Sequence, residues 1–269
     1  LWAAQTAGLP HNARICDAAC GPGDDIGALL DAAPGGTVVA VDKVCQFVAQ
    51  ARARHAGNDL VNVYEGEMTE IAGPFDFIWC AGAIYFPGIP AALQAWRQQL
   101  APGGAIAFSQ VCWFTDTTSE AARAGWANYA DMTDEAGVLM EVASAGFRVV
   151  GQRRLSDAAW EAYYTPLDKR IAMLDPEPDT ALAQVVDDAR AEAALWRAER
   201  VEAGDPDRFA AVMISPVAAR PVRFSLYAAN LEIARAPWVS NEPMIAEMRL
   251  QWWRDAFDEI VESKSVRRH

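Results

Sequence analysis

The stretch ARICDAACGPGDDIGALL, residues 13–30, decides the fold. The apolar run at 13–17 predicts a buried strand, Gly21 and Gly23 predict a tight turn, and residues 24–32 predict a helix. Glycine lets the backbone turn sharply and approach a ligand with no Cβ in the way. The first amides of the following helix would point at that ligand. This strand–turn–helix unit therefore predicts a ligand-binding loop.

The same alternation continues to about residue 155. Further apolar runs predict strands at 37–41, 61–64, 75–80, 105–111 and 147–155. Amphipathic stretches between them predict helices at 44–55, 89–100 and 134–145. Strand–helix alternation at this period predicts an α/β, Rossmann-like fold, in which a mostly parallel sheet carries helices on both faces. In such a sheet the ligand crevice lies at the carboxyl ends of the strands.

Beyond residue 155 the pattern becomes helical. Residues 181–201 are amphipathic, the sequence Gly-Asp-Pro at 204–206 interrupts the pattern, and further helices are predicted at 222–236 and 243–262. The formal net charge of −13 falls entirely within residues 1–204, whereas residues 205–269 hold nine basic and nine acidic side chains. A shift in charge of this kind suggests a boundary. We expect one domain at 1–203 and a helical segment at 204–269.

Composition excludes several classes of protein. A chain of 269 residues that is 52% hydrophobic has ample material for a core and is not a disordered chain. Its acidic body repels phosphate backbones, which argues against a nucleic-acid partner. No apolar run reaches the roughly 18 residues that a membrane-spanning helix needs. No leader is visible, and five cysteines without C-x-x-C spacing predict free thiols in the cytoplasm. Three scattered histidines predict no metal site.

Acidic residues follow the first three predicted strands. Asp17 ends the first strand, Asp42 closes the second, 21 residues after Gly21, and Glu67 follows the third. A carboxylate at the position of Asp42 can accept both hydroxyls of a ribose. The loop departs from the G-x-G-x-x-G spacing of dinucleotide sites, and acidic residues at 24 and 25 would repel a pyrophosphate. S-adenosylmethionine, which is cationic and lacks phosphate, fits better, although an NAD(P)-dependent oxidoreductase stays open.

These motifs resemble those of the class I S-adenosylmethionine-dependent methyltransferases over about residues 10–200. Residues 17–23 are similar to their glycine-rich loop, Asp42 to the acid that binds the ribose, and Glu67 to the acid paired with the adenine amino group. Ala19 stands where the family usually has a glycine, and Glu67 where it usually has aspartate. The resemblance implies a cofactor-binding set of Asp17, Ala19, Cys20, Gly21, Gly23, Asp42, Lys43, Glu67, Met68 and Cys80.

The family closes its sheet with a hairpin of strands six and seven. No clear seventh strand follows residue 200, and the apolar run at 209–214 is the candidate for it. Whether this run supplies the strand stays open.

Methyl transfer requires the nucleophile, the methyl carbon and the sulfur to be held in line, with water kept out. The loop after the fourth strand lacks an N/D-P-P-Y motif, and no histidine follows strands four and five to act as a base. Aromatic residues predict a pocket for a small flat or apolar acceptor, and ordinary packing is the alternative for half of them or more. We expect Tyr85 nearest the methyl group, and the pocket set is Tyr85, Trp113, Trp126, Trp160 and Tyr164.

Residues 204–269 resemble the opening of the squalene/phytoene synthase family, through segments at 205–209, 226–234 and 249–255. Those synthases bind prenyl diphosphate through Mg²⁺ on two Asp-rich motifs, but this chain has only Asn230 and Glu232 where the first would lie. The segment therefore implies no isoprenoid chemistry. It could arise from a fusion, a read-through or a truncated gene. A homodimer or a helical partner is expected through residues 222–262, and a non-catalytic binding or assembly protein is the alternative from another class.

Overall fold

The computed structural model describes residues 2–114, 119–127, 129, 131–174, 176–178 and 180–204. The chain divides into two compact units. The first, an α/β unit, comprises Leu1–Thr117 and Tyr129–Arg154, and the second, a helical unit, comprises Thr118–Asn128 and Leu155–His269. Each unit is described by itself.

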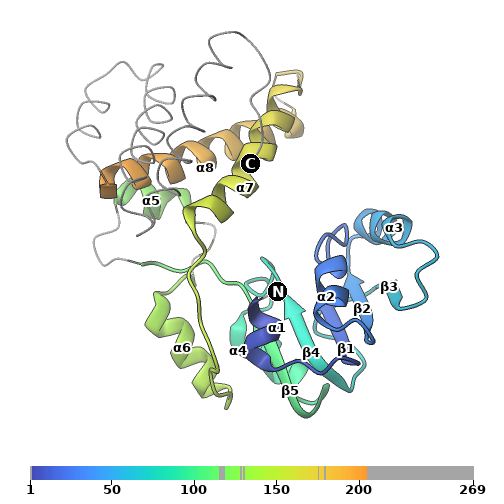
Figure 1. The fold of residues 1–269 in the computed structure, drawn as a ribbon. Coiled ribbons are helices and arrows are strands. Elements are labelled where there is room, and N and C mark those ends of the chain that lie inside the picture. Colours follow the sequence, from blue (N-terminus) through green and yellow to red (C-terminus); the bar gives the residue numbers. More distant parts are fainter. Residues whose placement is uncertain are drawn as a thin grey trace, which may run out of the picture. The chain divides into compact units, whose positions relative to one another are not determined.

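The α/β unit is built on a five-stranded sheet with the order β3-β2-β1-β4-β5 (Figure 1). Its strands are β1 (Arg14–Ala18), β2 (Thr37–Asp42), β3 (Val61–Glu65), β4 (Phe75–Cys80) and β5 (Leu100–Phe108). All neighbouring strands pair in parallel, which confirms the predicted sheet. The strand order reverses between β1 and β4. In open α/β sheets this reversal point is where ligands bind.

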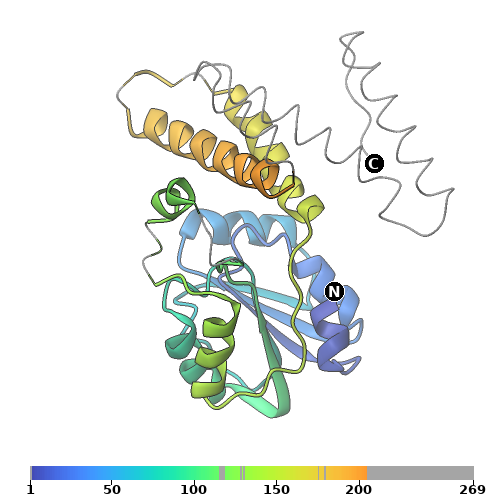
Figure 2. The same ribbon diagram turned by 90° about the vertical axis from the view of Figure 1, so that its left-hand side faces the viewer.

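Helices cover both faces of the sheet, as predicted, and Figure 2 shows α1 and α2 (blue) on the side opposite α4 (teal) and α6 (yellow-green). The helices of this unit are α1 (Trp2–Ala7), α2 (Ile26–Ala32), α3 (Cys45–Arg54), α4 (Ile89–Arg97) and α6 (Glu135–Ser144). Successive strand residues point to opposite faces. Ile15 and Phe77 therefore pack with α2 and α3, while their neighbours Cys16 and Ile78 pack with α4.

One predicted strand is absent, and the predicted bounds of another are wrong. Residues 147–155 form no strand, and the side chains of Val149, Val150 and Leu155 are exposed, because this apolar run has no strand beside it among the described residues. The fifth strand starts at Leu100, not at residue 105, and ends at Phe108. Phe75 pairs with Leu100 and Phe77 with Ala105, so a bulge accommodates the Pro-Gly-Gly turn within the strand. The candidate seventh strand at 209–214 lies outside the described residues.

The helical unit contains α5 (Glu120–Gly125), α7 (Asp157–Ala172) and α8 (Ala181–Gly204), which confirms the predicted helix at 181–201. The helices predicted at 222–236 and 243–262 lie outside the described residues. Aromatic rings fill the contact between α7 and α8: the ring centroids of Tyr164 and Trp196 are 5.2 Å apart, and those of Trp160 and Trp196 are 6.2 Å apart. Tyr164 is fully buried, and its hydroxyl donates to Glu192 Oε1 at 2.9 Å.

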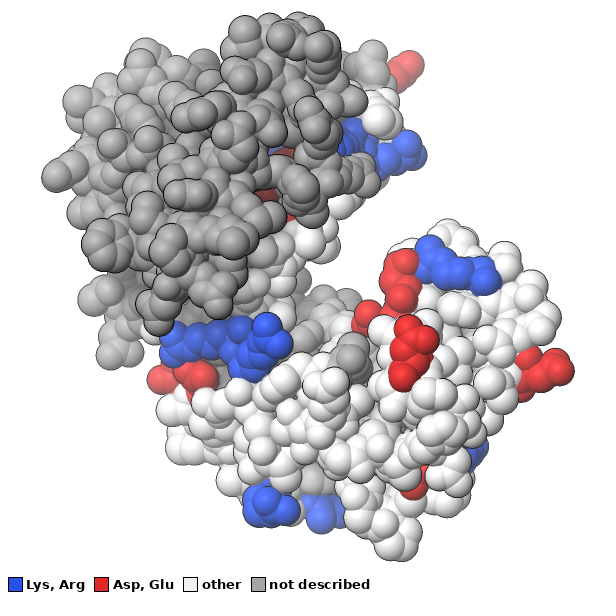
Figure 3. All heavy atoms as spheres, in the orientation of Figure 1, with Lys and Arg blue, Asp and Glu red and all other residues white. Residues whose placement is uncertain are grey.

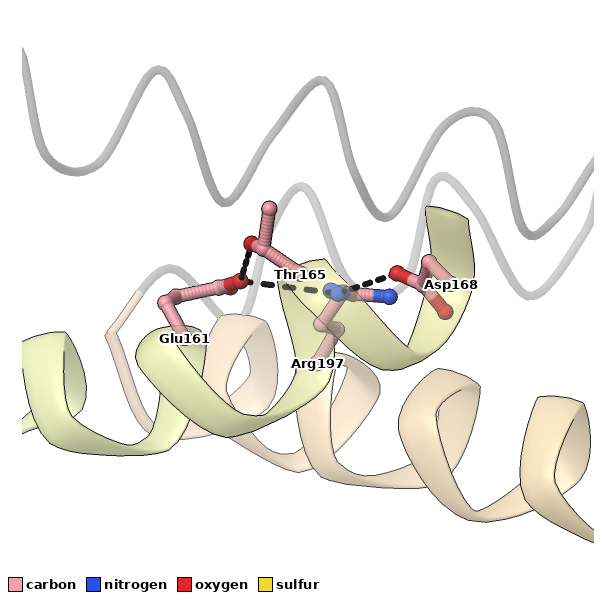
Figure 4. Close-up of polar contacts among 4 residues, drawn as sticks. All are labelled: Glu161, Thr165, Asp168 and Arg197. Atoms are coloured by element: carbon pink, nitrogen blue, oxygen red, sulfur yellow. Dashed lines mark hydrogen bonds and ion pairs between the residues drawn. The ribbon is translucent and has the colours of Figure 1, made fainter. Parts of the chain in front are cut away.

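An ion-pair network links the same two helices beside this aromatic cluster (Figure 4). Arg197 of α8 lies with its Nη2 2.7 Å from Asp168 Oδ2 and 3.4 Å from Glu161 Oε2, both on α7. Thr165 Oγ1 donates to the same Glu161 oxygen at 3.1 Å. Because the side chain of Arg197 is only 15% exposed, solvent screens this network less than it would a surface pair. It fixes the register of α8 on α7.

Charged side chains are spread over the surface of the described residues. On the face drawn in Figure 3, the basic groups stand apart and do not merge into one continuous stripe along the described part of the chain. Within that part, no helix combines the length and the apolar character needed to cross a membrane.

Candidate functional site

The loop after β1 takes up the strained turn that its glycines predict. Ala19, Gly21 and Gly23 all have positive φ angles, of 62°, 54° and 81°. The amide of Cys20 donates to Val41 O at 2.9 Å, which ties the loop to the end of β2. A residue with a Cβ pays about 1–2 kcal/mol for the left-handed conformation. Ala19, which replaces the glycine of the resembling family, therefore stores strain in the loop, as backbones at functional sites often do.

Asp42 lies against this loop, at the carboxyl end of β2. Its Oδ2 accepts from the amide of Gly21 at 2.8 Å, and its Oδ1 accepts from the amide of Val44 at 2.8 Å. A carboxylate has about four acceptor positions, so each oxygen keeps one for a ligand hydroxyl. The backbone carbonyl of Asp42 also accepts from Gly66, which brings the turn that carries Glu67 to the same edge.

Asp17 is the least satisfied polar group of the site. It lies one residue before the end of β1, is only 2% exposed, and its Oδ2 has no hydrogen-bond partner among the described residues. Burial, with smaller contributions from the carboxylates of Asp25 and Asp42, raises the pKa of Asp17 to about 8. Buried polar groups nearly always have a partner, and a native exception calls for an explanation. A cationic ligand group at the reversal point of the sheet would supply the missing partner.

Three contacts that the sequence did not predict hold the loop from outside. His55, directly after α3, has its Nε2 3.1 Å from Gly23 O, and Arg54 forms an ion pair with Asp24. Trp79 of β4 donates from Nε1 to Asp25 Oδ2 at 2.8 Å. Only Trp79 carried a signal in the sequence, because it lies near the carboxyl end of a predicted strand, where the ligand crevice was expected. Asp42, before α3, thus binds Gly21, and His55, directly after α3, binds Gly23. We call these two contacts the clamp of the loop.

This clamp gives a prediction for His55. His55→Leu removes the donor to Gly23 O and should weaken the binding of S-adenosylhomocysteine about three- to tenfold, since one hydrogen bond contributes about 0.5–1.5 kcal/mol. His55→Gln keeps a donor and should recover most of the affinity. Calorimetric titration measures both variants. The control is Arg52→Gln, because Arg52 lies on the same helix and donates to Val63 O. Equal affinities for His55→Leu and the wild type would remove His55 from the clamp.

The other predicted cofactor residues have different environments. Glu67 and Lys43 are exposed, and Lys43 Nζ lies 5.6 Å from the centre of the Phe86 ring. Met68 is buried, and its carbonyl accepts from the ring of Trp96 at 2.8 Å. Cys20 and Cys80 are buried too, and burial raises the pKa of both thiols to about 12, so neither is a thiolate at neutral pH.

The predicted acceptor residues are divided between the units. Tyr85 lies in the α/β unit, with its ring 4.5 Å from that of Phe86 and edge-on to Tyr129 at 5.1 Å. Trp113 belongs to the same unit, and its amide donates to Thr133 O at 2.9 Å. Trp126, Trp160 and Tyr164 belong to the helical unit. There, Trp160 and Tyr164 pack between helices, which was the alternative to lining a pocket.

The five cysteines are free, and the described residues hold no group of three side chains that could bind a metal ion.

Comparison with known proteins shows that the α/β unit is similar to methyltransferases. Residues 15–104 match the family described as "Methyltransferase domain". A methyltransferase from Geobacter sulfurreducens, solved in complex with S-adenosyl-L-homocysteine, superposes with a TM-score of 0.57 at 20% identity, over 78% of this chain and 83% of that one. The α/β unit has the class I methyltransferase fold. Residues 201–269 match the squalene/phytoene synthase family, and of these the structure describes only 201–204.

Two curated methyltransferases match about a third of the chain. Trans-aconitate 2-methyltransferase of Deinococcus radiodurans is 29% identical over 96 residues, which cover 35% of this chain and 36% of the relative. Malonyl-[acyl-carrier protein] O-methyltransferase of Enterobacter lignolyticus is 32% identical over 98 residues, 36% of this chain and 38% of the relative. The aligned part thus spans little more than a third of each relative.

Proposed function

We propose that the methyltransferase domain binds S-adenosylmethionine and transfers its methyl group to a small molecule by in-line displacement. The observation that carries this proposal is Asp17, a buried carboxylate with an unpartnered oxygen beside a glycine loop. The cofactor has a sulfonium and an ammonium, and no phosphate. A pyrophosphate would instead meet the carboxylates of Asp25 and Asp42, which lie close enough to Asp17 to raise its pKa. This disfavours a dinucleotide.

Each side chain of the site has a role in this proposal. Asp17 holds the ammonium of the cofactor, Asp42 its ribose hydroxyls and Glu67 its adenine amino group. Gly21 lets the backbone approach, because a Cβ there would meet no atom within 4 Å and the space beside it is open to a ligand. When bound, the sulfonium activates the methyl carbon toward nucleophiles. Tyr85, on the loop after β4, borders the acceptor. One curated relative is named for trans-aconitate, which supports a small-molecule acceptor, and the other for a malonyl group attached to a carrier protein.

The remaining part of the proposal concerns organisation and location. We place the boundary between the methyltransferase domain and the synthase-like segment near residue 204, close to residue 201, where the second family match begins. Five free cysteines support a reducing, cytoplasmic location. Residues 222–262 remain the proposed surface for a second copy or a helical partner.

Calorimetry with S-adenosylhomocysteine and with NADH tests the cofactor. We expect the wild type to bind the first and not the second. Asp42→Ala should weaken the binding of S-adenosylhomocysteine by about 1.5–3 kcal/mol, the range for hydrogen bonds to a charged group. The loss should be near the upper end, because the carboxylate also holds the amides of Gly21 and Val44. Binding of NADH alone would overturn the proposal, and unchanged affinity of Asp42→Ala would remove this residue from the site.

A chain ending at residue 204 tests the boundary. Among the described residues, the contacts of the cofactor loop involve only residues before 118, so this shortened chain should bind S-adenosylhomocysteine with the affinity of the full chain. Calorimetry compares the two chains, and thermal melting reports stability. A loss of cofactor affinity on shortening would show that residues beyond 204 belong to the methyltransferase domain.

A further inference from the structure

A cavity of about 370 Å³ lies in the α/β unit, beyond the carboxyl end of β5. Its walls come from three segments: the chain after β5, the first turns of α6, and the stretch that ends the unit. Its lining includes Trp113, Phe114, Leu139, Gln152 and Arg154, together with two carboxylates, Asp134 and Glu135. Asp134 is engaged at the start of α6, where its Oδ1 accepts from the amide of Gly137 at 2.7 Å. The segment 129–133 contacts both the cavity and the loop after β4. The ring of Tyr85 contacts that of Tyr129, the amide of Met132 donates to Tyr129 O, and the amide of Trp113 donates to Thr133 O.

Arg154 is exposed to solvent at this cavity and has two contacts there. Its Nη2 lies 2.6 Å from Glu135 Oε2, and its guanidinium carbon lies 4.6 Å from the centre of the Phe114 ring. Gln152 donates to the other oxygen of Glu135 at 3.2 Å, so both oxygens of that carboxylate are engaged. Arginine has five N–H donors in a planar fork. The ion pair and the ring contact use only some of these N–H donors. The others can donate to a ligand beside the side chains of Trp113 and Leu139.

A planar guanidinium binds carboxylates through two parallel hydrogen bonds. We propose that this cavity receives a small carboxylic acid with a flat apolar body, and that this acid is the methyl acceptor. Arg154 binds its carboxylate, and the aromatic wall contacts its body. This inference rests on the proposed methyl transfer.

The chemistry of a carboxylate acceptor agrees with the residues present. A carboxylate oxygen is already an anion at neutral pH, so it attacks the methyl carbon without a general base. The new O–C bond forms as the C–S bond breaks, and the sulfur keeps the electron pair. A carboxylate and a sulfonium thus give a neutral methyl ester and a neutral thioether, with no proton to move. The chain has three histidines: His55 is bonded to the glycine loop, His11 lies beside Gly35, and His269 lies outside the described residues.

The first test measures binding to the full chain without cofactor. Flat acids, namely benzoate, trans-cinnamate and trans-aconitate, are titrated by calorimetry beside their uncharged amides. We expect at least one acid to bind at least tenfold more tightly than its amide. Arg154→Gln should remove this preference, and Arg154→Lys should restore only part of it. The matched control is Arg153→Gln, because the adjacent exposed arginine does not line the cavity. If no acid binds better than its amide, or Arg154→Gln keeps the preference, the proposal is wrong.

The second test uses S-adenosylmethionine labelled on its methyl group. Acids that bind should yield methyl esters, which release labelled methanol in base, whereas methylated amines and phenols do not. Arg154→Gln should raise the KM for the acid at least tenfold and leave the affinity for S-adenosylhomocysteine unchanged. A wild type that binds S-adenosylhomocysteine and the acid but forms no ester would overturn the acceptor role alone. Failure to bind S-adenosylhomocysteine would overturn the proposed function, and the comparison of acids with amides would still decide what the cavity binds.

Discussion

Replacing Asp17 with asparagine is expected to raise the thermal stability of the free protein at alkaline pH and to weaken its binding of S-adenosylmethionine ten- to a hundredfold. Burial, with the nearby carboxylates of Asp25 and Asp42, raises the pKa of Asp17 from 3.8 to about 8. Between these values the folded protein binds more protons than the unfolded chain, so the free energy of unfolding falls as pH rises. Asparagine fills the same space without ionising, and it cannot neutralise an ammonium.

The difference in melting temperature between Asp17→Asn and the wild type should depend on pH. The melting temperature of Asp17→Asn should equal that of the wild type near pH 4, exceed it increasingly up to about pH 8, and then keep a constant lead, worth on the order of a few kcal/mol. Melting curves from pH 4 to 9 measure it, and Asp31→Asn, an exposed carboxylate on α2, is the control. A constant difference at all pH values would show that Asp17 ionises normally in the fold.

Cofactor binding should show the opposite trend. Because a cationic ligand requires the ionised carboxylate, the affinity of the wild type for S-adenosylmethionine should increase from pH 6 to about pH 8, with release of a proton. Calorimetry in buffers of different ionisation enthalpy detects that proton, and Asp17→Asn should release none. The same residue thus lowers the stability of the free protein and supports its function.

The sheet could be predicted because its strands carry their own signal. A strand buried on both faces, such as 75–80, reads as a short apolar run, and helices follow in regular alternation. Residues 147–155 carry the same signal and form no strand. A strand also needs a partner, and the local sequence does not record whether one is present. The early start of β5 has a similar cause, since a bulge depends on the register with β4.

The site was predictable where position along a strand determines it. Asp17 lies next to the end of β1 and Asp42 ends the neighbouring parallel strand β2, so topology alone brings their carboxylates to one edge of the sheet. His55 and Trp79 could not be found in this way, because their contacts with the loop depend on where α3 ends and how β4 meets α2. The aromatic residues show the same limit. Composition cannot tell a ring that lines a pocket from one that packs between helices, as Tyr164 does.

The largest loss of cofactor binding is expected for Gly21→Val. Gly21 has a φ of 54°, and a Cβ built on it meets no atom within 4 Å, so the added side chain would occupy the open space beside the loop. The proposed cofactor lies in that space, and binding of S-adenosylhomocysteine should fall more than a hundredfold. A β-branched residue at positive φ also costs about 1–3 kcal/mol of stability, which lowers the melting temperature.

Gly57→Val separates these two effects. Gly57 follows α3, has a φ of 78° and likewise has no atom within 4 Å of a built Cβ, but it lies outside the cofactor loop. Both variants should therefore lose similar stability in thermal melts, because each places valine in a left-handed turn that opens to free space. Only Gly21→Val should lose calorimetric binding of S-adenosylhomocysteine. Should Gly21→Val bind it as tightly as Gly57→Val, the cofactor does not approach the backbone at Gly21, and the loop after β1 has been assigned the wrong role.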